Sequence, residues 1–286
     1  MRGGGQGVWR SLRRDRGALI GFVLLGLVGL MALCADFSPW EADERDERPL
    51  AATEFHPLAP SGDHWLGTDK ASYDVFTRLL HGARWSLLTG VASILLALGL
   101  GVPLGAVSGY AGGRVDSVIT RSVDVMLAFP SIILAIAIAM VLDQRNVWTV
   151  IVAVGIVNVP TIARQVRASV LQVRGHDFVT AAQSMGFGPL RVLFRHVLPN
   201  CLAPILVLAT LGVGHAILSA AGLSFLGLGP ESRVPEWGVM LKDGFDYVNS
   251  REQWVVIPAG AAIAITVLGF NLIGDGLRKA LDPRAR

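Results

Sequence analysis

Long stretches without a formal charge constrain the fold of this chain more than any other feature. Each stretch has at least 18 residues and contains no Asp, Glu, Lys or Arg: 17–35, 85–108, 125–142, 146–163, 200–229 and 255–273. Such a length is about enough to cross a hydrocarbon core of roughly 30 Å as a helix. The whole chain is 52% hydrophobic and only 16% charged, which is typical of an integral membrane protein. The six runs therefore predict an all-α membrane protein with six transmembrane helices.

The first run has one alternative interpretation, a cleavable signal, because Arg13, Arg14 and Arg16 precede it. The run is too long for a typical signal core, and its Ala-Leu-Cys-Ala ending is a weak cleavage site. We therefore expect a retained span. The two cysteines, Cys34 and Cys201, lie at or near span ends and lack Cys-x-x-Cys spacing, so we expect small packing residues rather than a disulfide or a metal site.

The charges between the runs predict the orientation in the membrane. If the N-terminus is cytoplasmic, six spans return the C-terminus to the cytoplasm. The inner segments (1–16, 109–124, 164–199 and 274–286) then carry 16 basic and 6 acidic residues, whereas the outer segments carry 9 basic and 16 acidic ones. This is a positive-inside pattern, and the reverse orientation would violate it at nearly every loop.

The predicted organisation follows from the runs and the orientation. It comprises a cytoplasmic N-terminal tail (1–16), the first transmembrane helix (17–35), an external loop (36–84), a five-helix core (85–273) with a cytoplasmic loop (164–199), and a cytoplasmic C-terminal tail (274–286). The mixed charges of 41–48 indicate a solvated part of the external loop.

The cytoplasmic loop has the pattern of a short helix, a tight turn and a second helix. Gly186 or Gly188 can end the first helix in the left-handed conformation, and Pro189 suits the first turn of the second. One mildly apolar face at helical spacing comprises Phe178, Ala181, Ala182 and Met185. Such a knob could sit in a groove on another protein. The alternative is a loop that only connects two spans.

This loop resembles the "EAA" loop by which permease subunits of bacterial ABC importers engage their ATPases. The match is an Ala-Ala pair, three residues, a Gly, nine residues, a His, one residue, and Leu-Pro. His-x-Leu-Pro-Asn at 196–200 is similar to the variant of the dipeptide, oligopeptide and nickel permeases, although the leading Glu of that family is a Thr here. The resemblance implies an ATPase-coupling role for Thr180, Ala181, Ala182, Gly186, His196, Leu198 and Pro199.

Motifs in the same order extend the resemblance to residues 64–284. They include Leu-Gly-Thr-Asp at 66–69, Arg-Leu-Leu-x-Gly-Ala-Arg-x-Ser-Leu at 78–87 and Gly-Leu-Ser-Phe-Leu-Gly-Leu-Gly at 222–229. These segments are similar to the C-type permease subunits of the dipeptide/oligopeptide/nickel family. The implied fold is a type I ABC importer permease-like bundle with a cytoplasmic coupling helix. The acidic residue expected before the third motif is Ala220 or Ala221 here, which leaves the exact substrate open.

The third motif lies at the outer end of the fifth run. We interpret it as part of a pore or outer gate, with candidate residues Ser224, Phe225, Gly227, Gly229 and Trp237. The alternatives are small-residue helix packing for the motif, and membrane-interface anchoring for Trp237 and Trp254. His215, alone on its apolar run, is expected to be hydrogen-bonded within the bundle rather than to bind a metal.

Several motifs are missing from the sequence. There is no Gly-Lys dipeptide and hence no P-loop, and there is no His-Glu-x-x-His or Gly-x-Ser-x-Gly. We therefore expect no catalytic residues, no metal site and no cofactor in this chain. The runs contain no carboxylate or ammonium for an ion pathway, and no basic stretch with interleaved aromatic residues suggests nucleic-acid binding.

The sequence thus predicts the permease subunit of an ABC importer in a bacterial inner membrane, forming half of a pathway for short peptides. Its expected partners are a second homologous permease subunit, two ATPase subunits that bind ATP and Mg, an extracytoplasmic binding protein and membrane lipid. The alternatives are a nickel-chelate permease of the same family, a secondary transporter or channel that depends on ion gradients, and a membrane scaffold.

Overall fold

The computed structural model of the protein describes residues 4–39 and 57–281, which are almost entirely helical. Within these ranges the only β feature is an isolated bridge between Thr68 and Asp74. The charge run 41–48 lies outside the described residues. The helices are α1 (Gly4–Arg14), α2 (Arg16–Cys34), α3 (Val75–Ala111), α4 (Gly113–Leu127), α5 (Ser131–Leu142), α6 (Val147–Arg174), α7 (Asp177–Ser184), α8 (Pro189–Val192), α9 (Leu202–Leu223), α10 (Trp237–Gly244) and α11 (Ile257–Leu281).

Five segments containing the long helices α2, α3, α6, α9 and α11 are long and apolar enough to cross a membrane. The pair α4 and α5 passes the same test only when its two members are joined, and these helices meet at an angle of 94°. The described residues therefore contain five candidate spans, or six if the bent pair is one span. The prediction of an all-α membrane protein is confirmed.

The third predicted span, 125–142, is not one straight helix. Its first residues end α4, and the remainder forms α5 after a break at 128–130. Pro130 is the N-cap of α5, with φ −54° and ψ 129°. Proline has no N–H to donate to the preceding turn, and it disfavours helical geometry in Phe129 before it. The apolar run concealed this bend because hydropathy does not register backbone geometry.

Two other helices extend well past their apolar runs. α3 begins at Val75, ten residues before the predicted start at 85, and α6 continues to Arg174, beyond the predicted end at 163. The charged side chains at these ends have partners. Arg84 of α3, for example, donates from Nη1 and Nη2 to the carboxylate of Asp36 at 2.6 and 2.8 Å. A charged residue thus ends an apolar run without ending the helix.

Close packing of α3 on α6 depends on three glycines spaced four residues apart: Gly101, Gly105 and Gly109. A Cβ at Gly101 would lie 2.8 Å from Ile162 Cγ2, and one at Gly109 would lie 2.9 Å from Arg167 O. Four-residue spacing places the glycines on one helix face, where the absence of side chains lets two membrane helices approach closely.

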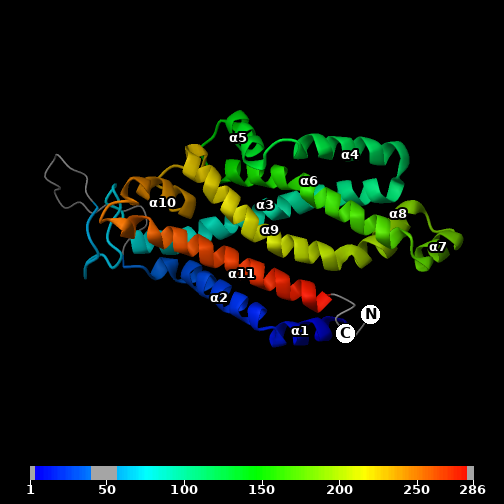
Figure 1. Ribbon diagram of the computed structural model, residues 1–286, viewed down its shortest axis with the longest axis horizontal. Helices are drawn as coiled ribbons and strands as arrows, with labels where there is room; N and C mark the ends of the chain where they lie inside the picture. Colours follow the sequence, from blue (N-terminus) through cyan, green and yellow to red (C-terminus); the bar gives the residue numbers. More distant parts are fainter. Residues whose placement is uncertain (1–3, 40–56, 282–286) are drawn as a thin grey trace.

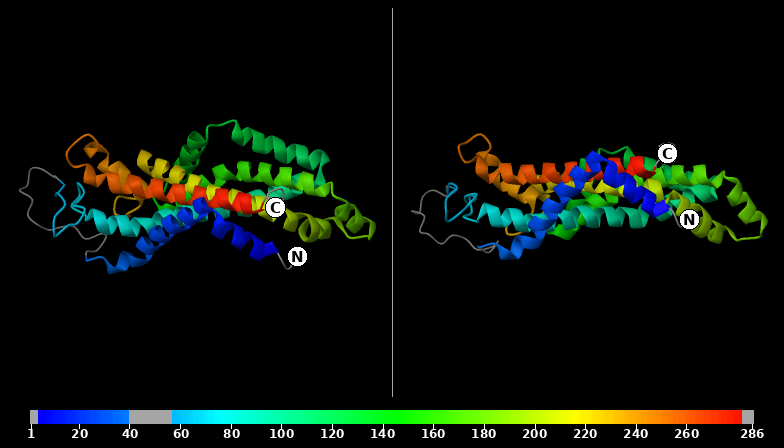
Figure 2. Two further views of the ribbon diagram at one scale, coloured as in Figure 1. Left: turned by 60° about the horizontal axis from the view of Figure 1, so that its bottom comes forward. Right: turned by 90° about the horizontal axis from the view of Figure 1, so that it is seen from below.

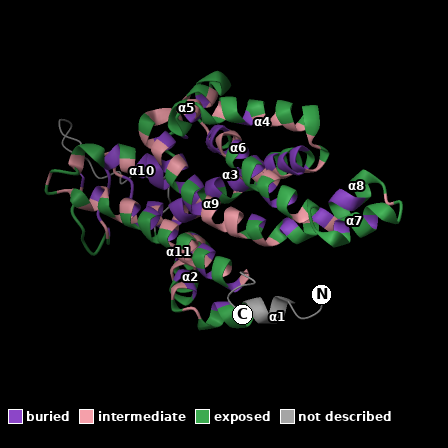
Figure 3. Cartoon of the chain, turned by 45° about the vertical axis from the view of Figure 1, so that its right-hand side comes forward, coloured by how far each residue is buried: buried purple, intermediate pink, exposed green. Residues whose placement is uncertain are grey.

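The two ends of the bundle differ (Figures 1 and 2). α1 and the C-terminal end of α11 lie at the same end as α7 and α8, whereas α10 and residues 57–74 lie at the opposite end. This arrangement agrees with an even number of membrane crossings. Buried residues line the contacts between helices, and the outward faces are largely exposed (Figure 3). These outward faces carry exposed Leu side chains on α2, α3, α9 and α11, as expected for surfaces that contact lipid.

Candidate functional site: the α7–α8 loop

A left-handed glycine ends α7. Gly186 has φ +80°, and its N–H donates to Gln183 O at 2.9 Å. The next N–H, of Phe187, reaches back to Ala182 O at 3.3 Å. These two bonds and the positive φ make a Schellman motif, which satisfies carbonyls that the helix end would leave free. Of the two candidate glycines, Gly186 takes this role, because Gly188 has φ −64°.

The second helix starts as the sequence predicts, with Pro189 in its first turn. It then widens into a π-helical turn at Leu193–Val197 and tightens into a 3₁₀ turn at Leu198–Cys201 before α9 begins. Pro199 has no N–H for the carbonyl four residues earlier, which accounts for the irregular turns. The Asn200 side chain donates to His196 O at 2.6 Å. The His-x-Leu-Pro-Asn motif thus forms the junction between the loop and α9.

The inner side of the loop is anchored to the bundle. Its buried residues belong to one cluster with Ala106 of α3 and Val166 and Val170 of α6; they are Val179, Ala182, Val192, Leu193 and Val197. Ala182 is only 1% exposed. The predicted apolar face of α7 is therefore divided, since Ala181 is exposed and Ala182 packs inside its own chain. Only the first of the two alanines is available for close approach by another protein.

An aromatic contact joins the two halves of the loop. The rings of Phe187 and His196 stack with centroids 5.7 Å apart and an interplanar angle of 13°. The guanidinium carbon of Arg191 lies 5.0 Å from the Phe187 ring centroid. The side chain of Gln183 donates to the Tyr110 hydroxyl of α3 at 3.4 Å. The loop is therefore a folded knob on the ends of α3 and α6.

The knob also carries four exposed large apolar side chains. Phe178 and Met185 were expected there from the sequence, and the structure adds Leu190 and Phe194 from the second half of the loop; their exposed fractions are 43%, 66%, 68% and 57%. Leu190 and Phe194 stand four residues apart, a helical spacing that could have revealed them. We call these four residues the outer patch.

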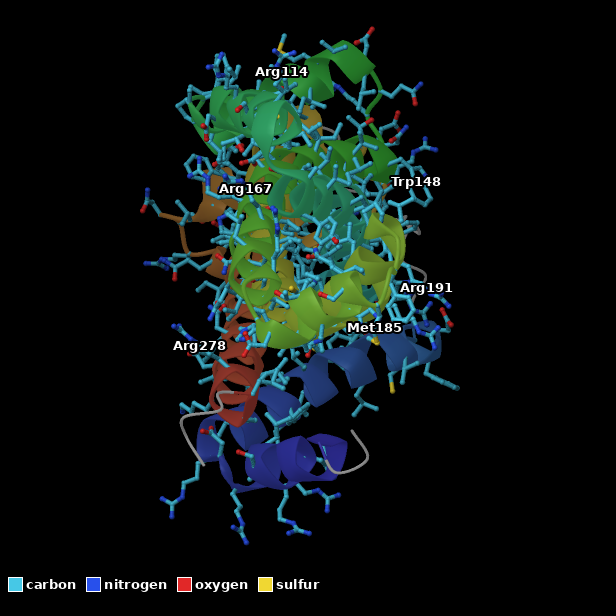
Figure 4. All side chains as sticks on the ribbon, turned by 90° about the vertical axis from the view of Figure 1, so that its right-hand side faces the viewer. Arg114, Trp148, Arg167, Met185, Arg191 and Arg278 are labelled. Atoms are coloured by element: carbon cyan, nitrogen blue, oxygen red, sulfur yellow. The ribbon has the colours of Figure 1, made fainter. Side chains whose placement is uncertain are left out.

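The other motif residues lie at the edge of the knob. Thr180 and Pro199 are exposed, whereas His196 and Leu198 are half-buried. Basic side chains surround this end of the bundle: Figure 4 looks onto it and shows Arg114, Arg167, Arg191 and Arg278 around it, with Met185 on the same end. Arg167 is paired, since its Nε and Nη2 donate to Asp116 at 2.6 and 2.7 Å.

The candidate gate residues lie at the opposite end. Gly227 has φ +86° within a π-helical turn at Ser224–Leu228, and Phe225 contacts Phe245 edge-to-face at 5.3 Å between centroids. Ser224 is buried, and a Cβ at Gly229 would collide with its hydroxyl. Ser224 and Gly229 thus pack closely against each other, and the gate role of Ser224, Phe225, Gly227 and Gly229 stays a prediction.

Trp237 corrects two predictions, because it is neither an interfacial anchor nor exposed to a pore in this chain. Its side chain is 0% exposed, and its Nε1 donates to Leu79 O at 3.1 Å. Gly82 of α3 leaves room for the ring, since a Cβ there would lie 2.5 Å from Trp237 Cδ1. The preceding Glu236 caps α10 by accepting from the N–H groups of Gly238 and Val239. Burial raises the pKa of Glu236, and these bonds partly offset the rise.

A buried cation ties the segment before α3 to the segment before α10. Arg78 is 1% exposed; its Nε lies 3.7 Å from Asp69 Oδ2, and its Nη2 donates to Ser232 O at 2.6 Å. Its guanidinium also lies over the Tyr73 ring, 4.7 Å from the centroid. Burial raises the pKa of Asp69, and the charge of Arg78 opposes the rise. These contacts stabilise the end of the bundle that is opposite the α7–α8 loop.

His215 lies within α9 and differs in part from its prediction. Its Nδ1 and the Ser219 hydroxyl are 3.3 Å apart, which is a hydrogen bond along its own helix. The side chain is exposed in this chain rather than enclosed by neighbouring helices. Among the described residues no group of three or more His, Cys, Asp or Glu side chains could hold a metal ion.

Known proteins with similar sequences cover nearly the whole chain. It is 43% identical to the dipeptide transport system permease protein DppC of Alkalihalophilus pseudofirmus over 97% of this chain and 89% of that protein. It is 42% identical to the di/tripeptide permease DppC of Pseudomonas aeruginosa (97% and 91%) and 40% identical to the oligopeptide permease OppC of Bacillus subtilis (96% and 88%).

The fold has a counterpart among solved structures. A chain of the MetNI methionine ABC transporter in an inward-facing conformation superposes with a TM-score of 0.60, at 19% identity, over 72% of this chain and 97% of that chain. Residues 5–57 match the N-terminal TM domain of oligopeptide transport permease C, and residues 101–286 match the binding-protein-dependent transport system inner membrane component. The chain therefore belongs to the inner-membrane permeases of binding-protein-dependent ABC importers, in the dipeptide/oligopeptide group.

Proposed function

We propose that this protein forms half of a translocation pathway for short peptides, which an extracytoplasmic binding protein delivers. A second homologous permease subunit supplies the other half, and two ATPase subunits bind ATP and Mg and drive transport. The peptide cargo is supported by relatives whose names specify dipeptides, di/tripeptides and oligopeptides.

One observation carries the assignment of the ATPase contact to residues 181–199. The loop is anchored by its buried residues to α3 and α6, and it presents the apolar outer patch at the end of the bundle. An exposed apolar surface on a rigid helical knob is the form in which a helix fits a groove on a partner protein. A movement of the ATPases would then be transmitted to α6 and α9, which the loop joins. The proposal also implies an orientation in the membrane: the end with the α7–α8 loop faces the cytoplasm, because the ATPases are there.

The experiment compares two carboxylate substitutions at this end of the bundle. Leu190→Asp places a charge in the outer patch, whereas Gln172→Asp places the same charge on the exposed end of α6 before the loop. A charge that must be desolvated in an apolar contact is costly. We expect Leu190→Asp to abolish co-purification of the ATPases and ATP-dependent peptide uptake, and Gln172→Asp to retain both.

The outcome separates the competing functions. ATPase binding that survives Leu190→Asp would remove the outer patch from the interface. Uptake in proteoliposomes that needs an ion gradient and no ATPase would replace the proposal with a secondary transporter. Uptake of a nickel chelate but of no peptide would change the cargo and keep the mechanism.

A further inference from the structure

A pocket of about 300 Å³ lies where the bent pair α4–α5 meets α6 and α9. Its size is at the lower end for a small-ligand site. Met126, Phe129 and Ile132 contribute to its apolar wall. The polar side chains that line it are Ser131 of α5, Asn158 and Thr161 of α6, and His215 and Ser219 of α9. Three helices thus bring their polar residues to one place.

Two of these polar residues lie far from the ends of candidate membrane helices, where polar side chains are rare. Asn158 is near the middle of α6 and His215 is past the middle of α9, and both helices are candidate spans. Polar groups that face hydrocarbon are costly, so residues of this kind usually face a bundle interior or a water-filled cavity. His215 is nevertheless exposed in the isolated chain. We therefore expect this side chain to face a partner subunit or a water-filled cavity in the assembled transporter rather than lipid.

The hydrogen bonds of these residues leave capacity for a ligand. Asn158 Nδ2 donates to Val154 O at 2.8 Å, and His215 Nδ1 is 3.3 Å from the Ser219 hydroxyl; both bonds run along a single helix. An asparagine amide retains a carbonyl oxygen and a second N–H after one such bond, and a histidine retains its other ring nitrogen. The pocket can thus offer both donors and acceptors.

The break between α4 and α5 adds backbone groups to the same place. Leu127 ends α4 and Ser131 begins α5, and both line the pocket. Pro130 caps α5 without a side-chain hydrogen bond, and the first N–H groups of a helix have no partner within it. Interrupted helices at membrane depth are tolerated where they line a cavity, and in transporters they commonly line the substrate site.

We propose that this pocket is the chain's share of the peptide pathway, and that it binds the passing peptide through its main-chain amides. This inference rests on the proposed function. The lining residues carry no carboxylate, ammonium or guanidinium group, so the pocket matches the neutral amides common to all peptides rather than particular side chains. Neutral hydrogen bonds also favour weak binding, which a pathway requires for release.

The test uses the complete transporter in proteoliposomes, with the binding protein and three tripeptides whose central side chain is neutral, acidic or basic. His215→Leu and Asn158→Leu remove hydrogen-bonding groups from the pocket but suit a membrane helix. We expect each to lower the uptake of all three peptides roughly five- to tenfold, as for a lost hydrogen bond that leaves a partner unpaired. ATP hydrolysis stimulated by the binding protein should persist.

Two further variants distinguish the loss of a ligand contact from a structural defect. Thr210→Leu is the matched control, because Thr210 is half-buried on the same helix but bonds to Leu206 O and does not line the pocket. It should transport as the wild type does. His215→Gln retains a donor and an acceptor and should restore most of the uptake lost in His215→Leu. Co-purification of the subunits verifies assembly for every variant.

A photoreactive tripeptide with a benzophenone side chain, added to the wild-type complex during turnover, provides a test independent of mutagenesis. Mass spectrometry should locate labelled residues in α6 or α9 beside the pocket. Labelling confined to other parts of the two permeases would overturn the assignment, as would wild-type uptake by both leucine variants. A defect restricted to charged peptides would overturn main-chain recognition. A wild-type complex that takes up no peptide would instead refute the proposed function, and the pocket's role with it.

Discussion

The close packing of α3 on α6 predicts opposite effects for the same substitution at two glycines of one helix. A Cβ at Gly105 would collide with the carbonyl oxygen of Ala163 and lie 2.8 Å from Val166 Cβ. A Cβ at Gly99 would meet no atom within 4 Å. Gly105→Ala and Gly99→Ala are therefore a matched pair that differs only in the room available for the added methyl group.

The expected magnitudes follow from two opposing contributions. Alanine stabilises a helix interior by about 0.5–1 kcal/mol relative to glycine. At Gly105 the added methyl group must also displace the backbone of α6, and overpacking of this kind typically costs about 1–3 kcal/mol. The upper part of that range, about 2–3 kcal/mol, applies because the methyl group at Gly105 meets backbone rather than a flexible side chain. After subtraction of about 1 kcal/mol for the helix gain, Gly105→Ala should lower the stability by about 1–2 kcal/mol. Gly99→Ala should leave the stability unchanged or raise it by up to about 1 kcal/mol.

The assay is thermal unfolding of the purified transporter in detergent, followed by intrinsic fluorescence. A change of 1 kcal/mol corresponds to roughly 2–4 °C in Tm for a chain of this size range. We expect Gly105→Ala to lower Tm by about 2–8 °C and Gly99→Ala to shift it by up to about 4 °C upward. ATP-dependent uptake should fall only in Gly105→Ala, because a displaced α6 also moves the α7–α8 loop.

Equal or higher Tm for Gly105→Ala would refute the reasoning, since it would mean that the helices do not approach as closely as the structure shows. A fall in Tm for Gly99→Ala would show that this face of α3 is covered by a neighbouring subunit in the assembled transporter.

Three further predictions concern the loop and the topology. Gly186→Ala should weaken uptake and ATPase co-purification, because alanine in the left-handed conformation costs about 1–2 kcal/mol. Gly188→Ala is the control and should have little effect, since φ there is −64° and a Cβ would meet no atom within 4 Å. Equal effects of the two substitutions would contradict a role for the positive φ of Gly186. Thr180→Ala should reduce uptake only mildly, because a hydroxyl offers a weaker contact than a carboxylate; complete loss of uptake in an assembled complex would show a direct role for this side chain. In a cysteine-free background, Arg251→Cys and Gln183→Cys both place a thiol at an exposed position. The first should react with an impermeant thiol reagent from outside and the second should not; external labelling at 183 would overturn the orientation.

The local chemistry of the loop was predictable because it depends on neighbours in the chain. The turn glycine and the proline that starts α8 act through backbone geometry that each residue type imposes. The division between Ala181 and Ala182 was not predictable, since it depends on how α7 rotates against α3 and α6. Helical spacing alone indicates an apolar face but does not specify which edge of that face packs within the chain.

At the outer end of the bundle, by contrast, contacts between residues far apart in the chain decide the structure, and these were not predictable from the sequence. Trp237 and Trp254 looked like interfacial anchors because aromatic residues near span ends usually are, but the cavity that holds Trp237 is made by Gly82, which is far away in the sequence. Arg78 similarly looked like a charge outside the membrane helix, whereas its Asp69 and Ser232 partners allow α3 to continue through it.

The sequence by itself determined the helical membrane class, the approximate places of the spans and the local form of the α7–α8 loop, since these depend on uninterrupted hydrophobicity and on backbone preferences of Gly and Pro. Only the tertiary structure decided that the third predicted span is divided into α4 and α5 at an angle of 94°, that α3 and α6 meet along a glycine face, and that Asn158 and His215 line one pocket. These features arise from packing between segments distant in the chain, and hydropathy contains no information on which helix faces meet.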